Sequence, residues 1–127
     1  MSVLIKGGRV VTATDSYVGD VLVEGERITK LGASLLASAD TVIDATGKLV
    51  LPGAIDPHTH LDMPFGGTTT IDDVTSGQTA AAFGGTTCHV DFVIQTPGDS
   101  FANALAAWHA KRDGKAIIDN GFHMAVT

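Results

Sequence analysis

The segment LPGAIDPHTH, residues 51–60, lies between two parts of the chain that have different sequence patterns. Its apolar start and its alternation of side chains predict a strand that ends near His60. Alternate residues of a strand share one face, so Asp56, His58 and His60 are expected to point the same way. Two imidazoles at positions i and i+2 can chelate one cation, and Asp56 can accept a hydrogen bond from a ligating imidazole. The segment therefore predicts a metal site at the carboxyl end of a strand, although two histidines satisfied by backbone carbonyls would give the same pattern.

The residues before this segment are predicted to form strands only. Short runs of alternating apolar and polar residues are separated by glycine or aspartate, and they lie at 3–5, 9–12, 20–23 and 27–31. Gly25 favours a hairpin turn between the last two runs. Gly47 favours a second turn, which would bring the chain back from a strand at 42–43 into a strand at 48–51. Residues 1–52 are therefore predicted to be a small all-β unit.

Strands and helices alternate in the residues that follow. They are expected as a strand at 53–60, a helix at 72–83, a strand at 86–94, a helix that begins after Asp99-Ser100, and a strand at 122–126. This order is typical of a parallel α/β structure. Three strands cannot close a (β/α)₈ barrel, which needs about 250 residues. The chain is therefore expected to be an N-terminal fragment that ends, at Thr127, before an active site is complete.

Composition excludes several classes of partner. The 127 residues are 44% hydrophobic and 17% charged, which predicts a folded globular segment. A net charge of −6 without a basic stripe argues against nucleic acid and anionic membranes as partners. The single cysteine, Cys88, cannot form an internal disulfide, and no leader or membrane-spanning apolar run is present. A cytoplasmic protein is the expectation.

Several blocks of the sequence resemble one family in the same order. They are LPGAIDPHTHLDMPFGG (51–67), TIDD (70–73), AAAFGGTT (80–87), DF (91–92) and HMAVT (123–127). Together they resemble the hydantoinase/dihydropyrimidinase branch of the amidohydrolase superfamily, over nearly the whole chain. Allantoinases and dihydroorotases keep the two histidines but usually differ directly after them. Met63-Pro64-Phe65 therefore favours the hydantoinase branch.

The resemblance implies a fold and a metal site. Members have a β-sandwich built from both chain ends around a distorted (β/α)₈ barrel. Residues 1–52 would be a β-sandwich portion, and residues 53–127 would be the first three strands and two helices of the TIM-like barrel. The barrel holds two divalent metals, usually zinc, and His58 and His60 would bind the more buried one. Met63 and Phe65 would shape a hydrophobic wall around the ring substituent of the substrate.

The remaining parts of that site are expected downstream of Thr127. They are a carboxylated lysine that bridges the metals, two further histidines and the catalytic aspartate that shuttles the proton. Lys111 and Lys115 cannot replace the bridging lysine, since neither is on a predicted barrel strand. The parent protein would hydrolyse the C–N bond of a hydantoin or dihydropyrimidine ring, and this chain alone is expected to be inactive and prone to aggregate.

Two alternative functions stay open. One is another cyclic amidohydrolase, such as an allantoinase. The other is a non-catalytic, dihydropyrimidinase-related interaction protein, although such relatives typically lose metal-binding histidines and both are present here. The resemblance also implies a homo-oligomer, usually a tetramer, that takes a small cyclic amide as its substrate.

The strand at 86–94 carries further candidate residues. Its apolar set is expected to face the helices; this set comprises Cys88, Val90, Phe92 and Ile94. Asp91 would then point inward near the catalytic rim, in a second-shell or structural role. His89 on the same face is interpreted as a hydrogen-bonded interior residue rather than a ligand. His123 on the third strand is interpreted as a packed, hydrogen-bonded residue rather than a ligand. Elsewhere His109 is expected at the surface, and the Gly- and Thr-rich residues 66–70 are expected to form a mobile lid.

Overall fold

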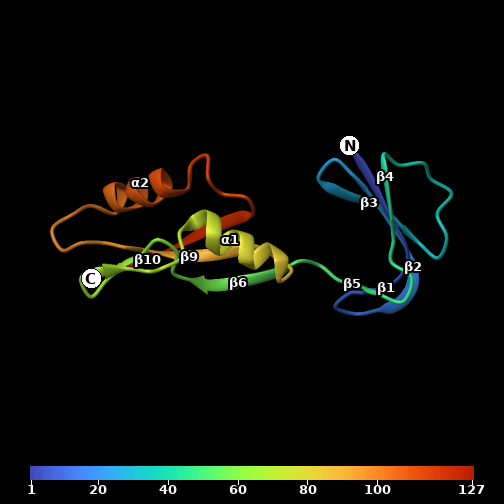
Figure 1. Cartoon of the computed structure of the whole chain (residues 1–127), viewed down its shortest axis with the longest axis horizontal. Coiled ribbons are helices and arrows are strands. Elements are labelled where there is room, and N and C mark those ends of the chain that lie inside the picture. Colours follow the sequence, from blue (N-terminus) through green and yellow to red (C-terminus); the bar gives the residue numbers. More distant parts are fainter. The chain divides into compact units, whose positions relative to one another are not determined.

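The structure is a computed structural model that describes all residues from 1 to 127. It divides into two compact units, Met1–Pro52 and Gly53–Thr127 (Figure 1). The boundary lies inside the LPGAIDPHTH segment, between Pro52 and Gly53. Neither helix of the chain has the length and the apolar character that crossing a membrane requires.

The first unit contains strands only. They are β1 (Ser2–Val11), β2 (Ser16–Glu24), β3 (Arg27–Gly32), β4 (Thr41–Asp44) and β5 (Leu49–Val50). These form one five-stranded sheet with the order β3-β2-β1-β4, in which β5 also pairs with β1. Neighbours β1–β2 and β2–β3 are antiparallel, whereas β4 and β5 each run parallel to β1. The prediction of an all-β unit is confirmed.

Strand β1 joins two runs that the sequence suggests as separate strands. Gly7 does not end the strand, because its φ of 68° allows a bulge where the register with β2 shifts. The buried carboxylate of Asp20 accepts hydrogen bonds from the backbone N–H groups of Gly7 and Leu35, each at 2.9 Å. These two hydrogen bonds lower the pKa of Asp20 from its usual 3.8, and the bond from Leu35 has the larger effect. Asp20 thus stabilises the bulge and the loop after β3 while it is ionised.

A close backbone approach in this sheet gives a first prediction. A Cβ on Gly19 would lie 2.7 Å from the carbonyl oxygen of Gly32, and this backbone atom cannot move cheaply. We expect Gly19→Ala to lower the free energy of unfolding by about 1–3 kcal/mol through overpacking. Gly84→Ala is the matched control, since its φ is −80° and its nearest contact is 3.4 Å away. Urea unfolding checks this, and equal midpoints for the two variants would contradict it.

The second unit alternates strands and helices. Its elements are β6 (Ala54–Thr59), β7 (Pro64–Phe65), β8 (Thr68–Thr69), α1 (Val74–Phe83), β9 (Thr86–Ile94), α2 (Phe101–Arg112) and β10 (Asp119–Ala125). Strands β10-β9-β6, in this order, form a parallel sheet, while β7 and β8 form a separate antiparallel hairpin. The chain is thus a strand-rich α/β structure with two helices.

Both helices begin where their capping residues predict. The side chain of Asp73 accepts a hydrogen bond from the N–H of Ser76 at 2.8 Å, and Ser100 accepts one from Asn103 at 3.1 Å. The buried face of α2, however, is Ala104, Trp108 and Arg112. Phe101, at the start of α2, is 48% exposed.

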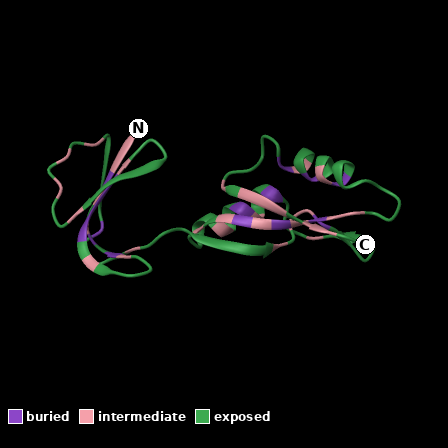
Figure 2. Cartoon of the chain, turned by 180° about the vertical axis from the view of Figure 1, so that it is seen from behind, coloured by how far each residue is buried: buried purple, intermediate pink, exposed green.

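The face of β9 that the helices cover is the opposite of the expected one. His89, Asp91 and Val93 are buried beneath α1 and α2, whereas Phe92 is only half-buried on the other face (Figure 2). Polar residues can occupy the covered face because Gln78 of α1 and Arg112 of α2 bond to them. The prediction that Asp91 points away from the helices is therefore wrong.

The residues after β6 form a hairpin, β7–β8. Gly66 and Gly67 have φ values of 58° and 82°, which suits a two-residue hairpin turn. At its base, Met63 and Thr70 bond twice, from Met63 N to Thr70 Oγ1 at 2.9 Å and from Thr70 N to Met63 O at 3.0 Å. The base of the segment is therefore fixed.

Candidate metal centre

The two imidazoles of the DPHTH motif converge at the carboxyl end of β6. The Nε2 atoms of His58 and His60 lie 3.2 Å apart, and the rings meet at 84°. Both rings lie against Phe92 of β9, with centroid distances of 4.5 and 5.3 Å. Since Phe92 is on the face of the sheet that the helices leave open, the histidine pair lies on that face too.

This spacing fits two ligands of one divalent cation. Tetrahedral zinc, with bonds to nitrogen of about 2.0–2.1 Å, holds two ligating nitrogens about 3.3–3.4 Å apart. Two exposed imidazoles that point at one another at 3.2 Å need only a small adjustment to share a cation. The chain brings no third His, Cys, Asp or Glu to this point. It therefore offers two ligands, where a structural or catalytic zinc uses three or four from the protein.

Asp56 does not share the face of the two histidines. In the pairing of β6 with β9, Asp56 is opposite His89 and Thr59 is opposite Asp91, so three steps on β6 match two on β9. The extra residue is a bulge at Pro57-His58, where proline has no N–H to give to the ladder. The bulge puts Asp56 and Thr59 on the helix-covered side, and the prediction of one common face fails here. The carboxylate of Asp56 accepts from the backbone N–H of His58 at 3.1 Å, not from an imidazole.

Asp91 contacts the carboxyl end of β6 from the helix-covered side of the sheet. Its Oδ2 forms a buried ion pair with Nη2 of Arg112 and also accepts from the backbone N–H of Leu61 at 3.3 Å. Its Oδ1 accepts from its own neighbour, Phe92 N, at 2.9 Å. Asp91 is thus bonded to the residue directly after His60, although it does not touch either candidate ligand.

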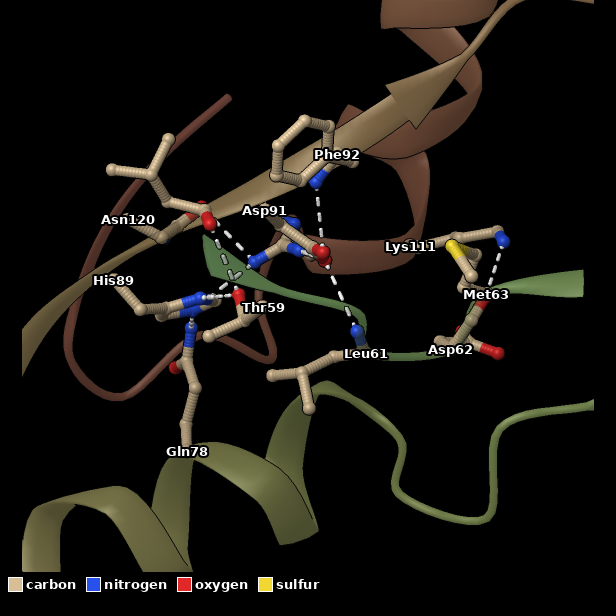
Figure 3. A network of polar contacts seen from close by, with 12 residues as sticks. Thr59, Leu61, Asp62, Met63, Gln78, His89, Asp91, Phe92, Lys111 and Asn120 are labelled. Atoms are coloured by element: carbon tan, nitrogen blue, oxygen red, sulfur yellow. Dashed lines mark hydrogen bonds and ion pairs between the residues drawn. The ribbon is translucent and has the colours of Figure 1, made fainter. Parts of the chain in front are cut away.

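His89 completes a network on this covered face, shown in Figure 3. Gln78 accepts the N–H groups of Ile117 and Ile118 on its Oε1, so its amide nitrogen faces Nε2 of His89 at 2.8 Å. His89 Nε2 must therefore be an acceptor, and Nδ1–H donates to Thr59 Oγ1 at 2.7 Å. The interpretation of His89 as a hydrogen-bonded interior residue agrees with this geometry.

A pH prediction follows from His89. Burial, and next the positive charge of Arg112, hold the pKa of His89 below 6.5. As the pH falls below about 6.5, the unfolded chain takes up a proton that the folded chain resists, so stability present above this pH is progressively lost. We expect the urea midpoint to fall between pH 7.5 and 5.5, and to fall less in His89→Gln.

His109→Gln is the control, because His109 is exposed and lies at the end of α2. It should keep the pH dependence of the unsubstituted chain. The same slope in His89→Gln as in this control would contradict the assignment.

The two residues predicted to line a substrate pocket lie in different environments. Met63 is 8% exposed and packs in the covered core with Val93, Ala104 and Trp108. It therefore does not present its side chain to an open site, contrary to the prediction. Phe65, at the turn of the β7–β8 hairpin, is 73% exposed and is free to contact a ligand.

His123 and Cys88 lie outside the histidine pair. His123 is exposed, on the face with His58, and its Nε2 lies 3.2 Å from the carbonyl oxygen of Pro57; its ring centroid is 5.0 Å from that of Phe92. It is hydrogen-bonded, as expected, and its exposed ring lies against Phe92. Cys88 is a free thiol of intermediate burial. Sequence reasoning missed Gln78 and Arg112; the signal for Arg112 was its place in the apolar stripe of α2, at i+4 from Trp108.

Several known proteins are similar to the chain over nearly its whole length. The chain is 54% identical over its full length to D-hydantoinase of Geobacillus stearothermophilus, of which it spans 27%. It is 46% identical, over 98% of its length, to dihydropyrimidinase of Rattus norvegicus, of which it spans 25%. The crystal structure of dihydropyrimidinase from Brevibacillus agri matches 99% of this chain and 27% of that one, with a TM-score of 0.96 and 56% identity. No protein-family model matches the chain. The chain thus spans about a quarter of the length of these relatives, and over nearly its whole length it is similar to proteins named D-hydantoinase and dihydropyrimidinase.

Proposed function

We propose that the protein to which this chain belongs is a metal-dependent hydrolase that opens a cyclic amide, a hydantoin or dihydropyrimidine ring. The observation that carries the proposal is the convergence of His58 and His60 Nε2 at 3.2 Å on an exposed sheet face. The relatives named D-hydantoinase and dihydropyrimidinase support the same substrate class. The net charge of −6 is in keeping with a small neutral substrate rather than nucleic acid.

The same proposal includes an architecture. The parallel order β10-β9-β6, with both helices against one face, is what the start of a (β/α)₈ barrel would have. The open face with the two histidines would then be the barrel interior, at the carboxyl ends of the strands where such enzymes place their active sites. Residues 1–52 would form a β-sandwich portion. The remaining ligands and the catalytic aspartate would come from residues beyond those in this chain.

In this function, each residue of the site has a task. His58 and His60 bind as neutral imidazoles, and the ring of Phe92 supports both at 4.5 and 5.3 Å. Zinc would supply Lewis-acid polarisation of the amide carbonyl and a water of lowered pKa. Asp56 fixes the bulge by accepting from His58 N. Phe65 is the residue of this chain that is placed to contact the substituent of the ring.

The test is a ring-opening assay of the natural gene product, purified from its source. Dihydrouracil and hydantoin are supplied separately, before and after removal of metal with a chelator and after addition of zinc. We expect at least one ring to be opened, loss of this activity on chelation, and recovery with zinc. Opening of neither ring, or activity that a chelator leaves unchanged, would contradict the proposal.

A further inference from the structure

The backbone directly after His60 has an unusual conformation. Asp62 has a φ of 52° and is the one non-glycine residue of the chain with a positive φ. This left-handed region is disfavoured for residues with a Cβ, so surrounding contacts must hold it. Both backbone groups of Asp62 are bonded, its N–H to the carbonyl of Asp72 at 2.9 Å and its carbonyl to Nζ of Lys111 at 2.6 Å.

Two adjacent residues near the end of α2, Lys111 and Arg112, hold the backbone at Leu61 and Asp62. The ammonium of Lys111 donates to Asp62 O and lies 4.5 Å from the ring centroid of Trp108. Arg112 is 3% exposed and pairs with Asp91, whose Oδ2 accepts from Leu61 N. Figure 3 shows the two connections side by side, one at Leu61 and one at Asp62.

The residue before His60 is held by the same network. Thr59 Oγ1 accepts a hydrogen bond from Nδ1–H of His89 at 2.7 Å and donates one to the carbonyl of Val90 at 3.2 Å. The side chain of His60 is exposed, its Nε2 lies 3.2 Å from that of His58, and its ring centroid lies 5.3 Å from that of Phe92. The backbone on the two sides of His60 fixes the direction of its Cα–Cβ bond, from which the imidazole reaches Phe92 and His58.

We infer that Lys111 and the Asp91–Arg112 pair are positioning residues for His60. They fix the turn at Leu61–Asp62 from the covered side of the sheet and so aim His60 Nε2 at the point that His58 Nε2 also faces. The inference rests on the proposed function, because it treats the two imidazoles as ligands. It assigns to the last turn of α2 a role in metal affinity, although neither residue touches the metal site.

The test compares Lys111→Met with Lys111→Arg in the natural gene product. Cobalt(II) replaces zinc, so that its visible absorption spectrum reports ligand geometry and a titration reports affinity. Lys111→Met should weaken cobalt binding about tenfold, at the lower end of the range for groups that orient ligands. Lys111→Arg can still donate to Asp62 O and should keep most of the affinity. Asp91→Asn keeps an acceptor for Leu61 N but leaves Arg112 without its counter-charge, and it should alter the cobalt spectrum as well.

Val74→Ala is the control for a general loss of stability, since Val74 is buried at the start of α1 and contacts neither Leu61 nor Asp62 through a hydrogen bond. It should lower the melting temperature and leave cobalt affinity unchanged. Equal cobalt affinity and equal spectra in Lys111→Met, Asp91→Asn and the unsubstituted protein would overturn the inference, and so would a loss in Lys111→Met that Val74→Ala or Lys111→Arg shares. If the unsubstituted protein binds no cobalt, or if His58→Ala leaves its cobalt binding unchanged, the proposed function itself fails, and the inference with it.

Discussion

Replacing His60 by alanine is expected to remove the bound metal from the natural gene product and to lower kcat/KM for ring opening by more than about 100-fold, the upper limit for residues that only orient a ligand. His58→Ala should have the same effect. Each substitution leaves a single imidazole, and one nitrogen ligand cannot replace a pair that converges at 3.2 Å. Metal content by mass spectrometry and steady-state kinetics measure the two losses.

His123→Ala is the matched control for this pair. His123 is also exposed, and its ring also lies against Phe92, but its Nε2 is directed at the carbonyl oxygen of Pro57. We expect it to keep its metal and most of its activity. If His123→Ala and His60→Ala lost metal and activity to the same extent, the ligand assignment would be contradicted.

Arg112→Met is expected to have the largest effect on stability, about 3–5 kcal/mol of unfolding free energy, because it leaves a buried carboxylate without its counter-charge. Side-chain exposures are 3% for Arg112 and 0% for Asp91, so water cannot take over the missing bonds. Urea unfolding at pH 7.5 measures the loss.

Two further variants make this prediction sharper. Lys115→Met removes an exposed cation of the same unit and should change the free energy of unfolding by less than about 0.5 kcal/mol. Asp91→Leu combined with Arg112→Met removes both charges and should cost less than Arg112→Met alone. A cost for Arg112→Met no greater than that of Lys115→Met would show that the ion pair does not stabilise the fold.

The order of the elements could be predicted from the sequence because local signals decide it. Candidate capping residues at 72–73 and 99–100 placed both helix starts, and the unbroken β-branched and apolar run placed β9 at Thr86–Ile94. The convergence of His58 and His60 followed from the i, i+2 spacing. These features depend on neighbours in sequence and need no knowledge of the tertiary structure.

The faces of the strands could not be predicted in the same way. Strict alternation put Asp56 with the histidines, but a bulge at Pro57 shifts the register by one residue. Hydrophobicity put Phe92 under the helices, but the covered position is taken by Asp91, since Arg112 from α2 neutralises it. The second outcome depends on Arg112, a partner far from Asp91 in sequence, and no pattern within β9 reports it.

The measurement that tests the central claim most directly is a crystal structure of the natural gene product with anomalous scattering at the zinc absorption edge. The account predicts an anomalous peak about 2.0–2.1 Å from the Nε2 atoms of both His58 and His60. A peak bound to other residues, or none while His58 and His60 bond directly to each other, would contradict it.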